Sequence, residues 1–375
     1  MTTISVPQPT GAPQPGPTPS GGRPAAPRAR AISWQGVRTI TVLELRQRVR
    51  STRWKVALIA WFCLVGLVML LLSGAVASTG DAEGGRWIFG LILLFVLGLG
   101  LLVAPTLSST AINGDRNAGT LAILQVTLLS PADIAVGKLL AGWTAALAFL
   151  AVSLPFLIWA ALLGGTDVLG FFRSLIVLAL LLAVVCAIGL GFSALTAKTA
   201  GSSVLTYVAV ASLTVISLVL FALSIPTVTV RNQPTQVFHV PDANWQDTNP
   251  TCEWERVDRD QVHTERTWWL LGINPFVVLA DAGPAVPSTD DWNVGPLEAI
   301  RSAVQLARHG AQDRVDECYG EAGTGEGLGL AQPSQAPIWP WGLATNLLLG
   351  GLSMWVAIRR LSVPYRKLPT GTRVA

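Results

Sequence analysis

The side chains best suited to metal binding or acid–base chemistry lie in one polar segment, residues 226–337. It contains His239, His263 and His309, which are all the histidines of the chain, and two of its four cysteines. Their spacing matches no metal-ligand motif, because such motifs place their ligands only a few residues apart. We therefore expect histidines on a solvated surface, no metal site and no catalytic site.

The four cysteines fall in two kinds of environment. Cys63 and Cys186 lie in apolar runs, where a free thiol behaves as a small apolar side chain. Cys252 and Cys318 lie in the polar segment, and an oxidising compartment would allow a disulfide between them. We expect this disulfide; the alternative is two unpaired thiols.

Nucleotide binding through a P-loop would need two glycines at fixed spacing, then Lys, then Ser or Thr. Gly137 and Lys138 supply the Gly-Lys pair, but Ala132 stands where the first glycine belongs and Leu139 follows the lysine. We infer that the chain has no P-loop and needs no cofactor of its own. Any ATP and Mg²⁺ would then be used by an ATPase in a separate chain.

The elements that carry these residues follow from hydropathy. Hydrophobic residues make up 51% of the chain and charged residues only 13%, against roughly 25% charged in soluble domains. A bilayer core needs about 20 apolar helical residues, and several runs are long enough. The runs cover residues 56–78, 87–112, 139–163, 174–197, 203–225 and 338–358, and none contains Asp, Glu, Lys, Arg or His. The sequence thus predicts an all-α polytopic membrane protein with six transmembrane helices in a lipid bilayer, the second bent by Pro105.

The distribution of Lys and Arg predicts the orientation. With six spans, both termini lie on one side. The tails and the second and fourth connections hold 17 Lys and Arg against 3 Asp and Glu, whereas the other connections hold 9 against 19. We therefore expect both termini in the cytoplasm, with the protein in the plasma membrane of a bacterial cell. Since this asymmetry accounts for the basic residues, the net charge of +4 gives no argument for a nucleic-acid partner.

The N-terminal part should lie on the cytoplasmic side. Residues 1–33 are rich in Pro, Gly and Thr, which predicts a disordered tail. Residues 34–55 predict an amphipathic helix on the inner leaflet, because Val42, Leu45 and Val49 recur at three- and four-residue spacing beside a basic side. An ordinary positive flank of the first span is the alternative.

Residues 226–337 separate the fifth and sixth spans and predict a large mixed extracytoplasmic domain. Within it, residues 296–310 have the pattern of a helix, with Pro at the start and Gly at the end. Residues 268–282 are apolar but too short to span, and the pair Asn274–Pro275 interrupts them. We expect them to pack on the ends of the spans or to dip into the interface. The chain closes with a cytoplasmic tail, residues 359–375.

The most specific pattern lies between the second and third spans and reads NGDRNAGTLAILQVTLLSPADIAVGK. A polar break at residues 113–119 precedes a short apolar segment, residues 120–129. Ser130, Pro131 and Asp133 then predict a helix start with a capping box. A short apolar helix exposed to water needs a covering surface, so it lies either on lipid or in a groove of another protein.

This pattern resembles the signature of permease subunits of ATP-binding-cassette (ABC) transporters of the type-2 export class, best over residues 39–211. The resemblance implies a coupling helix at about residues 117–129 that docks into a cytoplasmic ABC ATPase subunit, and an elbow helix at 34–55. The ATPase-coupling residues it implies are Asp115, Arg116, Gly119, Thr120, Leu121, Leu124, Thr127, Ser130 and Lys138. Two positions depart from the family pattern: Asp115 replaces the usual Glu, and Leu128 the usual Pro.

The fifth span carries a stripe of small hydroxyl residues, which includes Ser203, Thr206, Thr214 and Ser217. Helix packing supported by hydroxyl hydrogen bonds is the simpler interpretation. The alternative is a substrate path, which would suit a lipid-like or amphipathic cargo. Since the six runs hold no ionisable residue, the sequence argues against an ion-driven transporter and against an intramembrane enzyme.

Three functions remain open. The leading hypothesis is the permease subunit of an ATP-driven exporter, without an ATPase site of its own. Because six spans form only one wall of a path, we expect a second permease copy or a paralogue as partner. The alternative is a non-transporting membrane receptor or anchor whose external domain binds a ligand or envelope component. A membrane-bound enzyme with its site in the external segment is the third.

Overall fold

The computed structural model describes residues 32–79, 84–119, 129–239, 252–284, 295–317 and 336–362, and the statements below concern these parts of the chain. Most of the two predicted tails, residues 1–31 and 363–375, lies outside the described residues.

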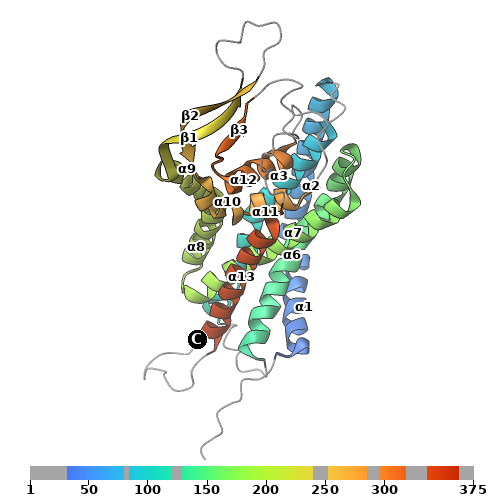
Figure 1. Ribbon diagram of the computed structural model, residues 1–375. Coiled ribbons are helices and arrows are strands. Elements are labelled where there is room, and N and C mark those ends of the chain that lie inside the picture. Colours follow the sequence, from blue (N-terminus) through green and yellow to red (C-terminus); the bar gives the residue numbers. More distant parts are fainter. Residues whose placement is uncertain are drawn as a thin grey trace, which may run out of the picture.

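Long apolar helices form an elongated bundle (Figure 1). Five continuous ones are α2 (Thr52–Thr79), α3 (Gly84–Ser108), α6 (Pro131–Leu163), α7 (Val168–Leu195) and α13 (Trp339–Leu361). The fifth span is composite, with α8 (Thr199–Ala211), the π-helix η1 (Ser212–Ile216) and α9 (Ser217–Val228) following one another without a gap. Six helices in the described part of the chain are long and apolar enough to cross a membrane, which confirms the six predicted spans.

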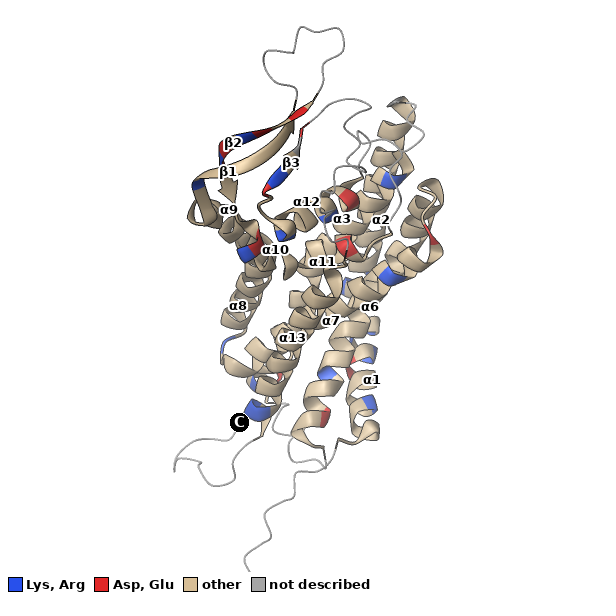
Figure 2. Cartoon of the chain, viewed as in Figure 1, with Lys and Arg blue, Asp and Glu red and all other residues tan. Residues whose placement is uncertain are grey.

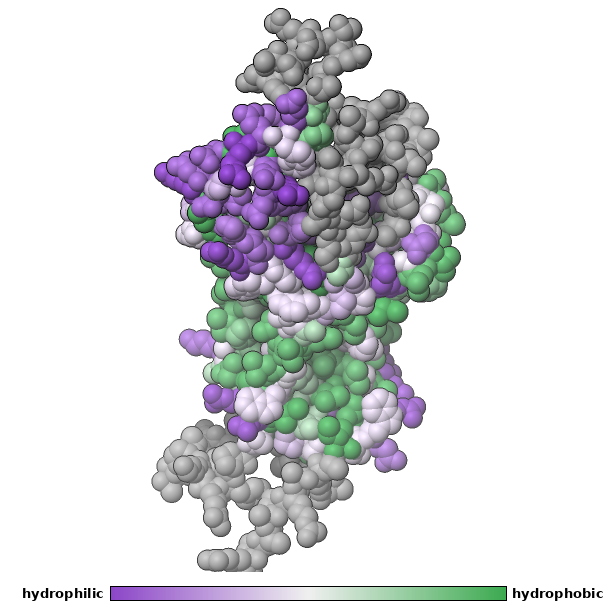
Figure 3. Space-filling view, viewed as in Figure 1, coloured by the Kyte–Doolittle hydropathy of each residue, from purple (hydrophilic) through white to green (hydrophobic). Residues whose placement is uncertain are grey.

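The core of the bundle lies around α7 and α3. In α7, 67% of the most apolar window is buried, against 17% in α2 and 11% in the fifth span. Gly189 of α7 allows the close approach to α3, since a Cβ atom there would collide with the Ser108 hydroxyl. The apolar side chains of α2 and the fifth span therefore remain largely outside, and Figure 3 shows hydrophobic residues across the middle of the visible face of the bundle.

A separate helix, α1 (Trp34–Arg50), precedes the first span. The predicted helix over residues 34–55 is therefore too long. Ser51 takes an extended conformation, with ψ of 126°, and its amide bonds back to the Arg48 carbonyl. This interruption ends α1, and the residues from Thr52 onward belong to the helix of the first span.

One face of α1 packs against the bundle. Val37 and Ile40 are buried against α6, and the Ile40 side chain lies over Gly137 of that helix. Of the residues predicted to face the leaflet, Val42 and Val49 are exposed and Leu45 is half-buried. The helix packs against α6 by the side that carries Val37 and Ile40, because Gly137 leaves room for Ile40.

After α3 the chain makes a turn and forms the short helix α4 (Asn113–Asn117). Helices α1 and α4 and the start of α6 lie at the same end of the bundle, which we call the α1 end. Basic side chains gather along α1 and at the end of α13 near the C-terminus (Figure 2).

At the opposite end, which we call the sheet end, three strands form a small sheet of order β2-β1-β3 (Figure 1). β1 (Thr229–His239) pairs antiparallel with β2 (Glu253–Val262) and parallel with β3 (Arg314–Asp316). β1 starts at the residue after α9 ends, so the fifth span runs directly into the sheet. The described residues of the predicted segment 226–337 thus contain strands as well as helices, and the sequence pattern did not predict these strands individually.

Short helices fill the space between the sheet and the bundle. They are η3 (Thr264–Arg266), α10 (Trp269–Gly272), α11 (Pro275–Ala282) and α12 (Pro296–His309). α12 confirms the predicted helix, with Pro296 in its first turn and Gly310 at φ of 71° after its end. α11 is almost entirely buried and packs against α3, α7 and α13, so the apolar segment 268–282 does pack on the ends of the spans.

Candidate functional site

Lys138 joins three elements at the α1 end. Its side chain, on α6, is only 2% exposed, and its ammonium group lies 2.5 Å from Glu44 Oε1 and 2.6 Å from Asp115 Oδ2. Glu44 belongs to α1 and Asp115 to α4. A buried ammonium group needs such partners, because desolvation without them is very costly. The ion pairs therefore hold α1, α4 and α6 in one arrangement, which we call the Lys138 junction.

Arg48 extends this junction to α3. Its guanidinium donates to the Leu107 carbonyl over 2.9 Å and lies 3.8 Å from the Glu44 carboxylate. Leu107 is in the last turn of α3, where backbone carbonyls have no partner within the helix. The Glu44 carboxylate thus lies near two cations, Lys138 of α6 and Arg48 of its own helix.

The start of α6 is held by a capping box, as the sequence predicted. The Ser130 hydroxyl accepts a hydrogen bond from the Asp133 amide, and the Asp133 carboxylate accepts one from the Ser130 amide over 2.9 Å. The same carboxylate also accepts from the Ser33 amide over 2.7 Å, at the start of α1. Asp133 therefore ties the beginnings of two helices that lie 100 residues apart in the sequence.

Asn113 fixes α4 against α7. It is fully buried, and the Ser193 hydroxyl lies within 3.2 Å of both its backbone amide and its side-chain oxygen. The Asn113 side-chain amide reaches the Lys198 carbonyl over 3.4 Å. Neither Asn113 nor Ser193 stands out in the sequence. Asn in a polar break gave no signal of burial, and Ser193 is one of many small residues in α7.

The two flanks of the predicted coupling helix are described, and its middle is not. Thr120, Leu121, Leu124 and Thr127 lie outside the described residues. The described members are Asp115, Arg116, Gly119, Ser130 and Lys138. Gly119 has φ of 73° and open space around its Cα, so the backbone leaves α4 through a conformation that favours glycine. Arg116 is half-buried on α4.

Glu44 is the member of the junction that the sequence analysis missed. It is the only acidic residue between residues 32 and 55, in a segment otherwise rich in arginine. A single carboxylate in such a basic helix indicates that Glu44 has a specific cationic partner. The spacing to Lys138, 94 residues away, gave no indication of which partner that is.

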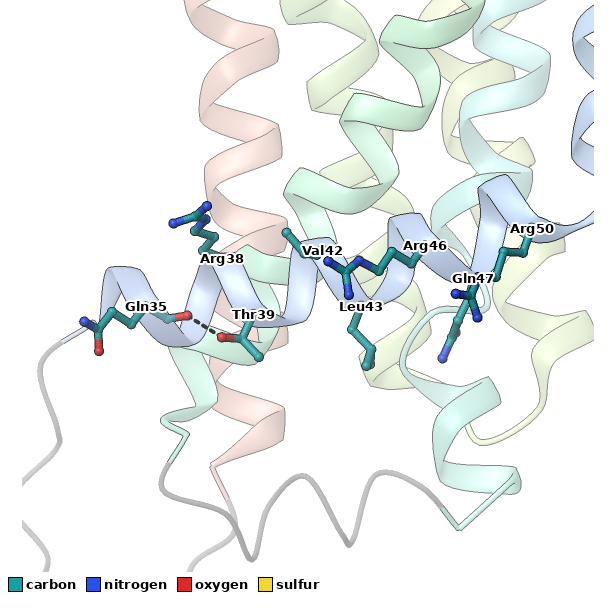
Figure 4. Close-up of a pocket in the computed structure, with 8 residues that line it drawn as sticks. All are labelled: Gln35, Arg38, Thr39, Val42, Leu43, Arg46, Gln47 and Arg50. Atoms are coloured by element: carbon teal, nitrogen blue, oxygen red, sulfur yellow. Dashed lines mark hydrogen bonds between the residues drawn. The ribbon is translucent and has the colours of Figure 1, made fainter.

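The outward side of α1 is basic. A concavity of about 750 Å³ follows it and is lined by residues of α1 that include Arg38, Arg46 and Arg50, with Val42 and Leu43 between them (Figure 4). Among the described residues that line it, none is acidic. The combination of basic and apolar groups suits an interfacial position. That this helix lies on the leaflet surface stays a prediction.

The hydroxyl stripe of the fifth span faces this chain's own helices. Thr206, Thr214 and Ser217 are buried, and Ser203 lies 3.0 Å from the Ser109 hydroxyl of the turn after α3. Several hydroxyls also bond to a carbonyl one turn back in their own helix, as Thr206 does to Ser202. This placement favours the packing interpretation. A substrate path along the stripe stays a prediction.

Asn274 contacts the same stripe from the sheet end. It is 1% exposed, and its side-chain amide donates to the Thr214 carbonyl over 2.7 Å and to the Ser217 hydroxyl over 3.1 Å. Its side-chain oxygen accepts from the Phe276 amide and so caps α11. One side chain thus links the π-helix η1 to α11.

The cysteines divide as expected where they are described. Cys63 and Cys186 are free, the first exposed and the second buried. Cys252 is disulfide-bonded. Cys318 lies outside the described residues, so its pairing with Cys252 stays a prediction.

The bundle and the Lys138 junction define a polytopic membrane protein. In this protein the connection between the second and third spans is joined by ion pairs to α1. The family model of the ABC-2 family transporter protein matches residues 38–304, from α1 into α12. The chain belongs to this family, and it is a membrane permease of the ABC-transporter kind, as the resemblance implied. Comparison with curated proteins gives no match for this chain.

Proposed function

We propose that this chain is the transmembrane half of an ATP-driven exporter whose ATP and Mg²⁺ are used by a separate cytoplasmic ATPase subunit. The observation that carries the proposal is the Lys138 junction. Asp115 lies just before the predicted coupling segment and Lys138 lies after it, and the Lys138 ammonium group pairs with both Asp115 and Glu44 of α1. A displacement applied to that segment would therefore move α1, α4 and α6 together.

The proposed orientation places the α1 end in the cytoplasm of a bacterial cell, with both termini on that side. The outward face of α1 and the last turn of α13 carry arginines, whereas the sheet end carries acidic residues beside basic ones. The positive-inside rule supports this assignment. It puts the predicted coupling segment on the side where ATP is available.

The proposal includes a second permease copy or a paralogue. The helices α2 and the fifth span bury the smallest shares of their apolar surface within this chain. Exposed apolar side chains run along them, for example Leu70 on α2 and Leu223 on α9. A partner bundle on one side and lipid on the other would cover these faces.

Co-purification with the ATPase tests the proposal. Gly119→Asp and Leu124→Asp should each break the complex, because a buried apolar contact would receive a charge. Gly165→Asp is the matched control: Gly165 also has positive φ, at 59°, and open surroundings, but it lies in the loop between α6 and α7. That variant should retain the ATPase.

Two outcomes would count against the proposal. If the wild-type chain brings down no ATPase in mild detergent, the receptor or anchor function becomes the better explanation. If Gly165→Asp disrupts the complex as strongly as Gly119→Asp, the ATPase does not bind through the segment between α4 and α6.

A further inference from the structure

A groove beside the joint of α1 and α2 has no role in the function proposed above. Its volume is about 640 Å³, and it is lined by α2, the α1 end of α3 and Phe149 of α6. The groove opens sideways from the bundle, because Ala57 and Ala60 on its α2 wall are both exposed. It therefore faces the lipid bilayer.

The floor of the groove is apolar and rigid. Trp61 and Phe149 meet edge to face at 4.9 Å between ring centroids, and the Trp61 indole donates to the buried Ser153 hydroxyl over 2.8 Å. Small side chains at Ala57 and Ala60 leave the space open above these rings. From Ser51 to Leu64 the lining follows α2 for about 20 Å at the rise of an α-helix, which exceeds the thickness of one leaflet, about 15 Å.

One end of the groove is polar and positively charged. Arg53 and Ser51 line it there, next to Trp54. Arg48 lines it too, but its charge is already engaged by the Leu107 carbonyl and by Glu44. Arg53 is exposed and forms no ion pair with any described residue, and no acidic side chain lines the described wall.

We infer that this groove binds one anionic phospholipid of the leaflet at the α1 end. An acyl chain would lie over Trp61 and Phe149, and the phosphate would meet Arg53 and Ser51. The positive charge of Arg53 at the polar end of the groove indicates an anionic lipid. An arginine near the headgroup level favours binding of anionic over zwitterionic lipid by about 1 kcal/mol, or roughly fivefold. Trp54 at the mouth suits the same headgroup level.

The bound lipid would add contacts between α2 and α3 beside the joint of α1 and α2. α2 is poorly buried, and its first turn follows directly from the interruption at Ser51. A chain in the groove would touch α2 and α3 at once. The lipid would thus fix the angle between the first span and the Lys138 junction.

Native mass spectrometry of the purified full-length chain tests this inference. The protein is exposed to equal amounts of phosphatidylglycerol and phosphatidylcholine with identical acyl chains. Wild type should retain one phosphatidylglycerol per chain, with about fivefold preference over phosphatidylcholine. Ala60→Trp should fill the groove and abolish retention, and Arg53→Gln should remove the preference.

Two matched controls separate the site from general surface effects. Ile59→Trp places the same indole side chain at an exposed position of α2 that does not line the groove. Arg50→Gln removes the same charge three residues from Arg53, on the outward face of α1. Both should retain lipid as wild type does, and thermal unfolding of all variants checks that they fold.

Three results would overturn the inference. The first is equal retention of the two lipids by wild type. The second is unchanged retention in both Ala60→Trp and Arg53→Gln. The third is a disulfide between two copies through Ala60→Cys, in a chain that also carries Cys63→Ser, since a second copy would then occupy the groove.

Discussion

The side-chain amide of Asn274 donates to the backbone carbonyl of Thr214 over 2.7 Å, at a depth where both residues are buried. Thr214 is the central residue of the five-residue π-helix in the fifth span. Insertions of this kind interrupt the regular hydrogen bonding of an α-helix and often mark functional positions. Asn274, at the sheet end of the protein, therefore holds the fifth span at the π-helix η1.

Replacing Asn274 should loosen the π-helix. Asn274→Ser keeps an oxygen that can cap α11, but its hydroxyl is too short to replace the side-chain amide that reaches Thr214, and Asn274→Ala removes both groups. Losing the donor to a buried carbonyl should cost about 1 to 3 kcal/mol. Hydrogen exchange over residues 212–217 should quicken at least about fivefold in both variants. If Asn274→Ser exchanges like wild type and only Asn274→Ala differs, the cap and not the Thr214 contact matters.

Breaking the Lys138 junction should destabilise the α1 end. Lys138→Met leaves Glu44 and Asp115 facing each other without their shared cation. We expect a loss near 3 kcal/mol, the lower end for a broken buried pair, because both carboxylates keep some solvent contact. Lys198→Met is the control, since Lys198 is exposed and makes no ion pair with a described residue. Thermal unfolding in detergent measures both.

A double-mutant cycle tests whether the junction acts as a unit. Glu44→Gln in the Lys138→Met background should cost much less than Glu44→Gln alone, since residues in one network are not additive. Full additivity of the two changes would show that Glu44 and Lys138 are energetically independent in spite of their 2.5 Å contact.

Gly119 and Gly114 should respond to alanine with opposite signs. Gly119 has positive φ, where alanine costs about 1 kcal/mol, whereas Gly114 lies inside α4, where alanine gains a similar amount. No atom of the described residues lies within 4 Å of a Cβ added at either position, so we expect the backbone conformation to decide. Gly119→Asn should lose less than Gly119→Ala, because Asn adopts this conformation more readily. Thermal unfolding of the three variants checks the order.

The disulfide of Cys252 should stabilise the sheet end. If Cys318 is its partner, the bond closes a loop of about 66 residues, which corresponds to about 4 kcal/mol in the chain-entropy model. Cys252→Ser should speed hydrogen exchange in β2, which begins at the next residue. Cys63→Ser should have no such effect. Peptide mapping under non-reducing conditions should find Cys252 joined to Cys318, and two free thiols would contradict the pairing.

The sheet should also weaken in acid. The Arg259 guanidinium donates to both oxygens of Glu317, at 2.5 and 3.0 Å, and this hydrogen bonding lowers the pKa of Glu317. A lowered carboxyl pKa stabilises the folded state above the ordinary pKa of about 4.3. That contribution is lost as the pH falls through the lowered value.

Hydrogen exchange in β3 measures this effect. Corrected for intrinsic rates, exchange should rise below about pH 4 in wild type and should be less dependent on pH in Glu317→Gln. Glu253→Gln, at an exposed end of β2, should behave as wild type. The pair is partly exposed, so the effect is expected to be small. If hydrogen exchange in Glu317→Gln depends on pH as it does in wild type, the Arg259–Glu317 ion pair is not the cause of the pH dependence.

The helical part of this fold could be predicted because its signals are local. Length and composition alone give the six spans, and Ser130, Pro131 and Asp133 mark the start of α6 within four residues. Pro296 and Gly310 bound α12 in the same way. Each of these signals depends on residues that are neighbours in the sequence, so no knowledge of tertiary contacts is needed.

The remaining features depend on contacts between distant residues. Lys138 meets Glu44 across 94 residues, and Asn274 meets Thr214 across 60. The Asn274–Pro275 pair was visible as an interruption of an apolar segment, but a break predicts only a turn or a cap. The face that α1 buries against α6 could not be predicted, because the packing of Ile40 over Gly137 joins residues that lie far apart in the sequence.

The last helix of the fifth span, α9, continues directly into β1, so the strand extends the span beyond the bundle. Val228 ends the helix and Thr229 begins the strand, and the His263 amide bonds to the Val228 carbonyl over 3.0 Å. Because no residue separates the helix from the strand, a small rotation of the helix would displace the far end of the strand by a larger distance. A spectroscopic label near His239, at the end of β1, would therefore report motion of the fifth span. The residues of the span itself would not have to be changed.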